Sequence, residues 1–474
     1  MTSGQSYTGR QLDSVKPDGV KPLSDHPELP SAATDDPTKM PAYDGAALPA
    51  GGAPLSLEQI YDMALTNDPT LRAAYSELQA VGQGTLAARA GLLPTVTAEG
   101  SYTGVQEDVV QTSNVVYQKG SASWPEYAYT LSLTQPLFDM SLWQKWREAQ
   151  AAERKEVASY AFAQQDLILR VATAYLSILA AQDQIALSGA ERDTTRKQLE
   201  VVKAKAQAGQ STPVDLSEVQ ARLDVQDANY LLAQSSLADR QQGLLEIIGH
   251  VGANLQPVKA GLKLANPQPA NVQSWLSQAL AQNWSIRVAA AAVEVARKEV
   301  GVQRAGHYPT VSLRASTGTN QTGDSLFGGG STIADTRYMV NLKIPLYGGG
   351  YATAMSNAAA DRLTAAEMQL SLARRKVQRQ VLSSYQSIAV GVDRVAALQR
   401  SVKSFQQALD LKQQGYQSGL NDIVSVMDAS RNLYNAKRQE AEARYNYLLD
   451  SLKLKQAAGV LSEKDIVAIS RSLS

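Results

Sequence analysis

The chain contains an internal duplication, and this feature restricts its fold more than any other. Residues 90–96 (AGLLPTV) return as residues 305–311 (AGHYPTV), 215 positions later. Further along, Gly209 and Gly419 occupy matching places at an offset of 210. Ordered matches at a nearly constant offset are the signature of a repeated supersecondary unit. We therefore expect two structural repeats with the same order of elements.

The limits of the two repeats follow from composition. Eight of the 18 prolines fall before residue 55, in a stretch rich in Ser, Asp and Gly. Such a stretch has little apolar surface to bury and is typical of a disordered arm. The predicted parts are a Pro-rich arm at 1–54, a first repeat at 55–251, a linker at 252–271, a second repeat at 272–460 and a C-terminal tail at 461–474.

Each repeat shows the same series of predicted elements: a helix, two alternating strands, a very long helix and a returning helix. The predicted helices are 57–89, 142–208 and 214–248, then 272–304, 352–418 and 422–458. The predicted strands are 95–102, 127–134, 310–318 and 338–344, and the Gly-rich segment 318–336 is expected to be a long loop. At about 1.5 Å per residue, each long helix is roughly 100 Å in length.

The ends of the long helices carry clear turn signals. Both helices end at glycine, Gly209 and Gly419, which is the common residue after a helix C-terminus. In the first repeat Thr212 then stands as a helix N-cap, with Pro213 at the first helical position and Asp215 at the third. The sequence therefore predicts two long helical hairpins.

The alternating segments are too few to close a barrel within one chain, because about eight strands are the smallest number known. Three copies of the chain would supply twelve strands, with the polar face toward a wet lumen. Aromatic residues beside the strands favour a membrane boundary. These residues are Phe138, Trp143, Trp146, Tyr347 and Tyr351. Periodicity alone equally allows half-buried sheets in a soluble domain.

Composition argues against catalysis and against nucleic acid as a partner. Lys+Arg and Asp+Glu are 45 each, so no net positive charge draws the chain to nucleic acid. There is no cysteine, and the three histidines, His26, His250 and His307, are far apart. We therefore expect no catalytic residues, no metal site and no cofactor.

Apolar runs in the sequence are short. No segment holds 18 consecutive apolar residues, so we expect no transmembrane helix. The first 25 residues contain no apolar core of the kind a signal peptide has. The expectation is therefore either a mature or trimmed form, or a chain that is not exported.

Several segments of the sequence resemble the TolC-type family of outer-membrane efflux and type I secretion channels. They are residues 432–437 (NLYNAK), 443–448 (ARYNYL), 454–459 (LKQAAG) and 133–141 (LTQPLFDMS). The resemblance spans about residues 56 to 470, with the internal repeat in phase. It implies a mixed α and β membrane protein in the outer membrane that extends into the periplasm.

The resemblance also implies how copies assemble and with what. Each repeat would give two strands to a trimeric, twelve-stranded transmembrane β-barrel and long helices to a periplasmic α-helical barrel. The partners would be two further copies of the chain, outer-membrane lipid, a periplasmic adaptor (membrane fusion protein) and an inner-membrane transporter of the RND or ABC type. The duct would be a passive conduit that these partners open.

Residues at the helical tips match the periplasmic gate of the family. Asp215, Tyr416 and Asp428 occupy positions of gate residues. Asn421 stands where the family has an arginine, and Ser425 stands where it has a second aspartate. We therefore expect a weaker lock and a single ring of acidic side chains around the three-fold axis, which would attract cations. Glu218 is the repeat equivalent of Asp428 and is a further candidate.

The same residues have simpler explanations, which stay open here. Asp215 can act only as a helix-capping acid, Asp428 as a solvated acid and Tyr416 as a packing residue. The turns at Gly209, Thr212, Pro213 and Gly419 form the hairpins and would also dock the adaptor. For the chain as a whole, the alternative function is a coiled-coil scaffold, intracellular or periplasmic, without channel activity.

Overall fold

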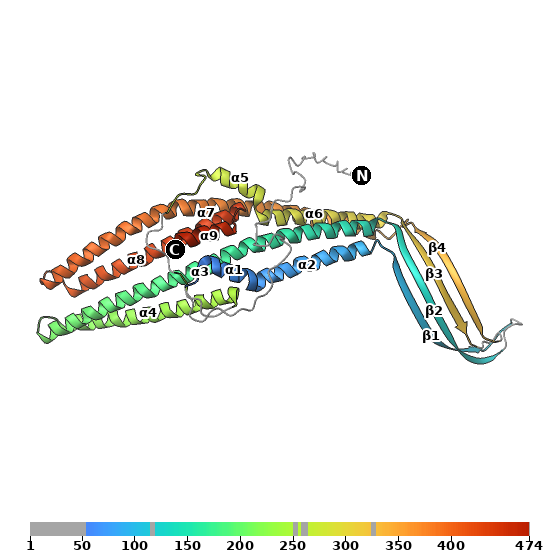
Figure 1. The fold of residues 1–474 in the computed structure, drawn as a ribbon, viewed down its shortest axis with the longest axis horizontal. Helices are drawn as coiled ribbons and strands as arrows, with labels where there is room; N and C mark the ends of the chain where they lie inside the picture. The colour runs from blue at the N-terminus through green and yellow to red at the C-terminus, as the bar shows by residue number, and fades with distance from the viewer. Residues whose placement is uncertain (1–53, 114–118, 250–254, 257–263, 324–328, 474) are drawn as a thin grey trace, which may run out of the picture.

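The structure is a computed structural model that describes residues 54–113, 119–249, 255–256, 264–323 and 329–473. Over these ranges the chain forms a long rod of helices with a four-stranded sheet at one end (Figure 1). The sheet bends away from the rod, and the tips of two helical hairpins lie at the opposite end. The predicted arm, apart from its last residue, and part of the predicted linker lie outside the described residues.

Two helical hairpins make up most of the rod. They are α3 (Met140–Gln207) with α4 (Pro213–Ile248), and α7 (Tyr351–Gln417) with α8 (Ile423–Ala458). Each turn contains a glycine in the left-handed region, Gly209 at φ 70° and Gly419 at φ 78°. L-residues with a side chain are strained in that conformation, which explains glycine at both turns. The helix bounds lie within two residues of those predicted from the sequence.

The first helix of each repeat is broken, so the prediction of continuous helices at 57–89 and 272–304 is wrong. The observed pairs are α1 (Leu57–Asn67) with α2 (Pro69–Ala90), and α5 (Val272–Gln282) with α6 (Trp284–Arg304). Asp68 and Asn283 are the residues at the breaks, and both have extended backbone dihedrals. Each side chain accepts a hydrogen bond from the backbone N–H three residues later and so caps the second helix.

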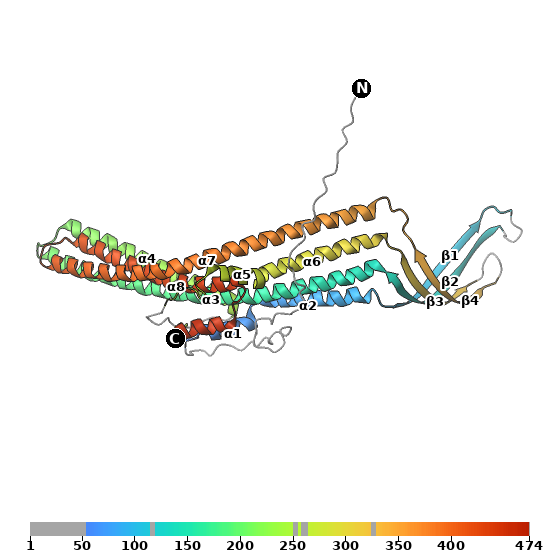
Figure 2. The ribbon, with the colours of Figure 1, turned by 90° about the horizontal axis from the view of Figure 1, so that it is seen from above.

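Four helices run side by side from the middle of the rod to the sheet. Figure 2 shows α2, α3, α6 and α7 as one layer, with successive members in contact. Toward the tips, α4 packs on α3 and α8 packs on α7, while α3 also contacts α8. The two repeats therefore meet along α3, through α6 near the sheet and through α8 near the tips.

The sheet is antiparallel, with strand order β1-β2-β3-β4. Its strands are β1 (Thr95–Val109), β2 (Gly120–Asp139), β3 (Thr310–Thr322) and β4 (Ser331–Lys343). The repeats join in the centre of the sheet, where β2 pairs with β3 from Glu126 opposite Thr322 to Asp139 opposite Thr310. In the described part of the chain, β1 and β4 each pair on one side only.

The strands are longer than the sequence predicts. The segment 318–336 is not a long loop, because β3 continues to Thr322 and β4 begins at Ser331. Its glycine, threonine and serine residues gave a loop-like composition. The register explains Gly318: a β-carbon there would lie 2.7 Å from the carbonyl oxygen of Tyr129 on the neighbouring strand. Only glycine permits that close approach of the two backbones.

The largest apolar core lies in the middle of the rod. It gathers buried residues of α1, α2, α3, α4, α8 and the C-terminal helix α9 (Glu463–Leu473), which lies within the predicted tail. Tyr175 of α3 is almost fully buried, and its hydroxyl donates to the carbonyl oxygen of Gln256 at 2.9 Å and shares the same proton with the carbonyl oxygen of Leu55 at 3.3 Å. This core therefore ties the start of the first repeat and part of the linker to the longest helix.

Across the described ranges, each helix is either too short or too polar to pass through a membrane.

Candidate functional site

The tips of the two hairpins pack together around a small apolar cluster. Its buried members come from α3, α4, α7 and α8: Leu199, Val202, Val219, Leu223, Leu409, Ile423, Val426, Met427 and Leu433. Burial of these side chains fixes how the four helix ends lie against one another. The polar residues that the sequence marks as a gate all lie beside or just beyond this cluster.

Asp215 forms a capping box with Thr212 at the start of α4. The N–H of Asp215 donates to the Thr212 hydroxyl at 3.1 Å, and the Asp215 carboxylate accepts the N–H of Thr212 at 2.9 Å. The Ser211 hydroxyl also donates to this carboxylate at 3.0 Å. The Thr212 N–H and hydroxyl together hold the pKa of Asp215 below its usual range. The capping role is thus present in the structure.

Tyr416 lies in the last turn of α7, close to the first hairpin. The ammonium of Lys205 on α3 stands 3.8 Å from the centre of its ring. The same ammonium donates a hydrogen bond to the Tyr416 carbonyl oxygen at 3.4 Å. Burial raises the pKa of Tyr416, and the negative charge of Asp215 adds to the rise. Asp215 and Tyr416, two of the predicted gate residues, therefore lie on different hairpins but near enough for the charge of one to act on the other.

The second turn is held together within its own hairpin. The carboxylate of Asp422 accepts the N–H of Ser425 at 2.8 Å and caps α8. The amide of Asn421 donates to the carbonyl oxygen of Lys412 at 3.5 Å. That amide lies so close to Gly415 that a β-carbon at this glycine would overlap it. Asn421 thus packs on the end of α7.

Asp428 is paired, and its partner is a residue that sequence analysis missed. Arg222 of α4 donates to the Asp428 carboxylate of α8 at 2.9 Å and to the Glu218 carboxylate at 2.9 Å. Arg431 stands 3.7 Å from the same oxygen of Asp428. The expected acidic group is therefore balanced by arginine within one chain. The spacing of Glu218 and Arg222, four residues on one helix, was the available signal.

A second polar bridge joins the hairpins further from the tip. Glu191 of α3 is 2% exposed, and its carboxylate accepts a bond from Arg438 of α8 at 2.7 Å. Gln226 of α4 donates to the other carboxylate oxygen at 3.1 Å. Removal of one partner from such a buried pair leaves the other charge buried without compensation, which destabilises the fold. No sequence motif distinguished Glu191 from the other acids of the long helix.

The outermost surface of the tips is formed by the turn residues. Gly209, Thr212, Pro213 and Gly419 lie here, with the exposed apolar side chains of Val214 (72% exposed) and Leu420 (84% exposed) beside them. Space around both glycines is open, since a β-carbon at either would meet no atom within 4 Å. The turns thus present small and apolar groups to the exterior.

The predicted membrane-interface aromatics gather at the junction of helices and sheet. Phe138 belongs to β2 itself rather than to the segment after it. Trp143 and Trp146, in the first turns of α3, lie edge to face with ring centres 5.2 Å apart. Tyr347 and Tyr351, before and at the start of α7, are 90% and 70% exposed. All five lie near one level of the molecule, where the rod meets the sheet.

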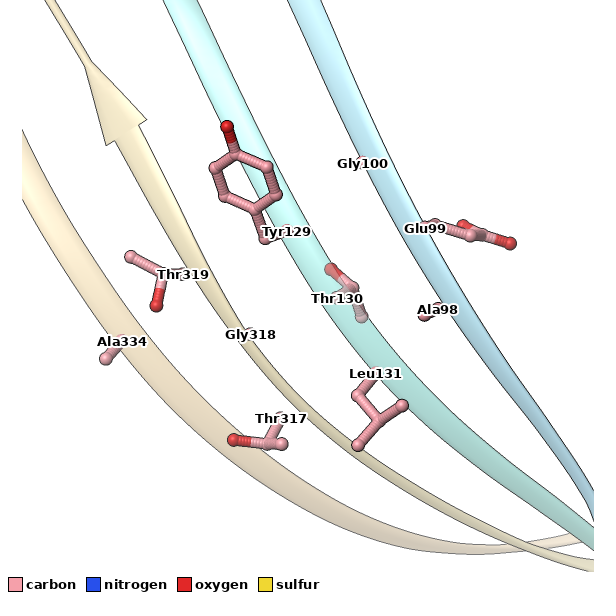
Figure 3. Close-up of a pocket in the computed structure, with 10 residues that line it drawn as sticks. All are labelled: Ala98, Glu99, Gly100, Tyr129, Thr130, Leu131, Thr317, Gly318, Thr319 and Ala334. Carbon is pink, nitrogen blue, oxygen red and sulfur yellow. The ribbon is translucent and has the colours of Figure 1, made fainter.

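A shallow hollow crosses the four strands (Figure 3). Its lining consists of Ala98, Glu99, Gly100, Tyr129, Thr130, Leu131, Thr317, Gly318, Thr319 and Ala334. Small residues on neighbouring strands create the hollow, and Glu99 is the only charged side chain among these ten. The lining therefore supplies no acid–base pair and no nucleophile with a base. Elsewhere in the described ranges, no three His, Cys, Asp or Glu residues group as metal ligands.

Comparison with known proteins gives one consistent result. The family model described as outer membrane efflux protein matches residues 60–250 and 275–460, which are the two repeats. The chain is 30% identical over 420 residues to the outer membrane protein TolC of Vibrio cholerae, covering 88% of this chain and 94% of that protein. It is 31% identical over 433 residues to TolC of Escherichia coli, covering 88% and 85%.

Further similarities point the same way. The alkaline protease secretion protein AprF of Pseudomonas aeruginosa is 30% identical over 422 residues, covering 87% of this chain and 86% of that protein. Among solved structures, the CmeC outer membrane channel of Campylobacter jejuni superposes with a TM-score of 0.74 at 16% identity, covering 88% of this chain and 90% of that one. At that identity the likeness shows the fold alone.

Proposed function

The chain belongs to the outer membrane efflux protein family, and we therefore propose that it is the outer-membrane exit duct of a tripartite efflux system or a type I secretion system. The duct spans the outer membrane with its sheet and extends into the periplasm with its helices. The family consists of conduits and not of enzymes. The observation that carries the proposal is the match of both repeats over most of the chain.

A trimer is the assembly that this fold favours. The four-stranded sheet is open at β1 and β4 in the described part of the chain. In lipid, every backbone N–H and C=O needs an internal partner, so open edges must pair with other copies. Three sheets give twelve strands in a closed barrel. The exposed apolar side chains Tyr338, Val340 and Leu342 of β4 then face lipid.

The partners follow from the kinds of system in which relatives work. The chain resembles both TolC and a protein named for alkaline protease secretion. A duct in either kind of system receives cargo from an inner-membrane transporter, of the RND or ABC type, through a periplasmic adaptor. The exposed turns around Gly209 and Gly419 offer the adaptor a surface of small and apolar groups.

The gate of the duct is proposed to lie at the hairpin tips. Glu218, Asp428 and Arg222 form a polar group between α4 and α8, while Asp215 at the first turn lies near enough to Tyr416 at the second to raise its pKa. Asn421 and Ser425 support the second turn from within. Three copies of these tips around one axis make a narrow entrance that opens when the hairpins separate.

The proposal is tested with the purified protein in detergent and in planar bilayers. Light scattering with detergent correction is expected to give three copies of the 50.9 kDa chain. Addition to a bilayer is expected to give discrete conductance steps. A soluble monomer that produces no conductance would instead support the alternative, a coiled-coil scaffold without channel activity.

A further inference from the structure

We propose that Arg222 sets the charge of the tip constriction and clamps the two hairpins together in the closed duct. It does so by bridging Glu218 and Asp428, the equivalent acids of the two repeats. The inference rests on the proposed function, since it concerns the gate of the duct. It changes what the sequence alone implies for Asp428, which is a free acidic ring.

The geometry is that of a two-armed bridge. One terminal nitrogen of the Arg222 guanidinium lies 2.9 Å from Glu218 and the other lies 2.9 Å from Asp428. The first contact is within α4 and orients the guanidinium. The second crosses from the first hairpin to the second, between residues 206 positions apart in sequence. The planar fork of arginine suits two acceptors at once, whereas a lysine ammonium is a single point charge.

The surroundings strengthen this bridge. The side chain of Arg222 is 24% exposed, against 38% for Glu218 and 44% for Asp428. Its neighbours Val219 and Leu223 on α4 are buried in the apolar cluster of the tips. The guanidinium therefore lies beside that cluster, and the side chain is about three-quarters covered. Screening by solvent is weaker there than for a fully exposed pair.

The repeat shows that the bridge is asymmetric. Glu218 and Asp428 occupy matching positions, at the offset of 210 that relates the turns. The position that matches Arg222 holds Asn432. One arginine thus serves both acids, and Arg431 stands near Asp428 as a second cation. Two acids and two arginines leave this part of each tip with no net charge.

This charge balance yields opposite effects for two substitutions that break the same bridge. Arg222→Gln leaves each tip one unit more negative, and Asp428→Asn leaves it one unit more positive. Either change removes the link between α4 and α8 and so favours separation of the hairpins. Ion selectivity should therefore shift in opposite directions, whereas the probability of the open state should rise in both. A structural defect alone would not produce opposite shifts.

The experiment uses the full chain in planar bilayers under a KCl gradient, with MgCl₂ as the blocking salt. Arg222→Gln is expected to move the reversal potential toward cation preference and to strengthen Mg²⁺ block. Asp428→Asn is expected to move it toward anion preference. Open probability should rise by roughly two- to five-fold in both variants, as expected for loss of a part-exposed ion pair. Arg222→Lys should keep the selectivity but still raise the open probability.

Two further variants complete the design. Lys453→Gln removes one positive charge from α8 far from the tip, where it pairs with Asp450 at 3.2 Å, and should change neither readout. The double variant Arg222→Asp with Asp428→Arg restores opposite charges and should return open probability toward the unmodified value. It also covers the case in which a single variant fails to assemble into trimers.

The outcomes separate the two proposals. If the unmodified protein conducts but Arg222→Gln and Asp428→Asn shift selectivity in the same direction, or neither shifts it, the role of Arg222 is overturned. If the double variant is as open as the single ones, the clamp is overturned. If the unmodified protein forms trimers but never conducts, the proposed duct itself fails.

Discussion

At the scale of single residues, Asp215 shows how one side chain can cap a helix and also belong to the proposed gate. Asp215 closes a capping box with Thr212 and also lies close enough to Tyr416 to raise the pKa of that tyrosine. Its own pKa is lowered by the Thr212 N–H and hydroxyl. The capping explanation and the gate explanation are therefore compatible, since both use the same ionised carboxylate.

Substitution of Asp215 by alanine should fray the first turn of α4 and raise open probability. Loss of the capping bonds costs about 1 kcal/mol of stability. Because the folded-state pKa of Asp215 is lowered, its contribution is present above the unfolded pKa and is lost as pH falls. The difference from the unmodified protein should thus shrink below about pH 4. Thermal unfolding at several pH values measures this.

The control for that experiment is Asp224→Ala. Asp224 lies on the same helix and is exposed, and it accepts a bond from Gln220 without capping the helix end. It should change stability little at any pH. An equal loss in both variants, at neutral and at acid pH alike, would argue against the capping role of Asp215.

At the scale of elements, the sequence predicted features that nearby residues determine and missed features that depend on contacts with distant residues. The hairpins were predictable because the C-terminal glycine Gly209 and the N-cap Thr212 mark the turn within a few residues of each other. The break at Asn283 was not, since its amide donates to the carbonyl oxygens of Gln456 and Ala457, more than 170 positions away. The ion pair between Arg222 and Asp428 was not predicted for the same reason, since its residues are 206 positions apart. Neither contact can be derived from a single sequence.

The C-terminal helix α9 provides a pH-dependent element. Burial raises the pKa of Glu463, and the nearby Asp62 of α1 adds to the rise. Burial, with Glu58, likewise raises the pKa of Asp62. An acid whose folded pKa is raised binds protons more tightly when folded, so docking of α9 weakens as pH rises through the interval between the two values. Stability of this contact is therefore greater in acid.

Replacement of Glu463 by glutamine should strengthen the docking of α9 at neutral pH. Cleavage of the helix by a protease should slow roughly three-fold at pH 7, and the difference should vanish near pH 4, where the acid itself is protonated. Limited proteolysis at both pH values measures the effect. Glu77→Gln, an exposed acid on α2, is the control. Faster cleavage of the Glu463 variant at pH 7 would contradict the argument.

At the scale of the whole molecule, the rod and the sheet divide the work of a duct. The sheet alternates exposed apolar residues with polar ones along β4, where Val340 pairs with Leu313 and Asn341 with Ser312. Successive residues of a strand point to opposite faces. One face of the sheet is therefore suited to lipid and the other to a water-filled lumen.

This division predicts different results for arginine at two neighbouring positions. Val340→Arg places a charge on the proposed lipid face and should reduce folding into liposomes. The expected cost is about 1 kcal/mol, because Val340 lies near the junction end of β4, where the membrane boundary is expected, and not at the bilayer midplane. Asn341→Arg places the same charge on the lumen face and should leave folding intact. The folded fraction recovered in liposomes measures both. Equal losses would mean that the two faces are not divided in this way.

The pairing of β2 with β3 has a consequence for biogenesis. Asp139 finds its partner only when Thr310 arrives, 171 positions later in the chain. In a hairpin of β1 and β2 alone, the edge of β2 that pairs with β3 stays open until the whole intervening helical segment is present. Synthesis of that segment alone takes roughly 10–35 seconds at about 5–20 residues per second. Until β3 is present, the open edge of β2 is prone to aggregation, because an unpaired strand edge can pair with another chain.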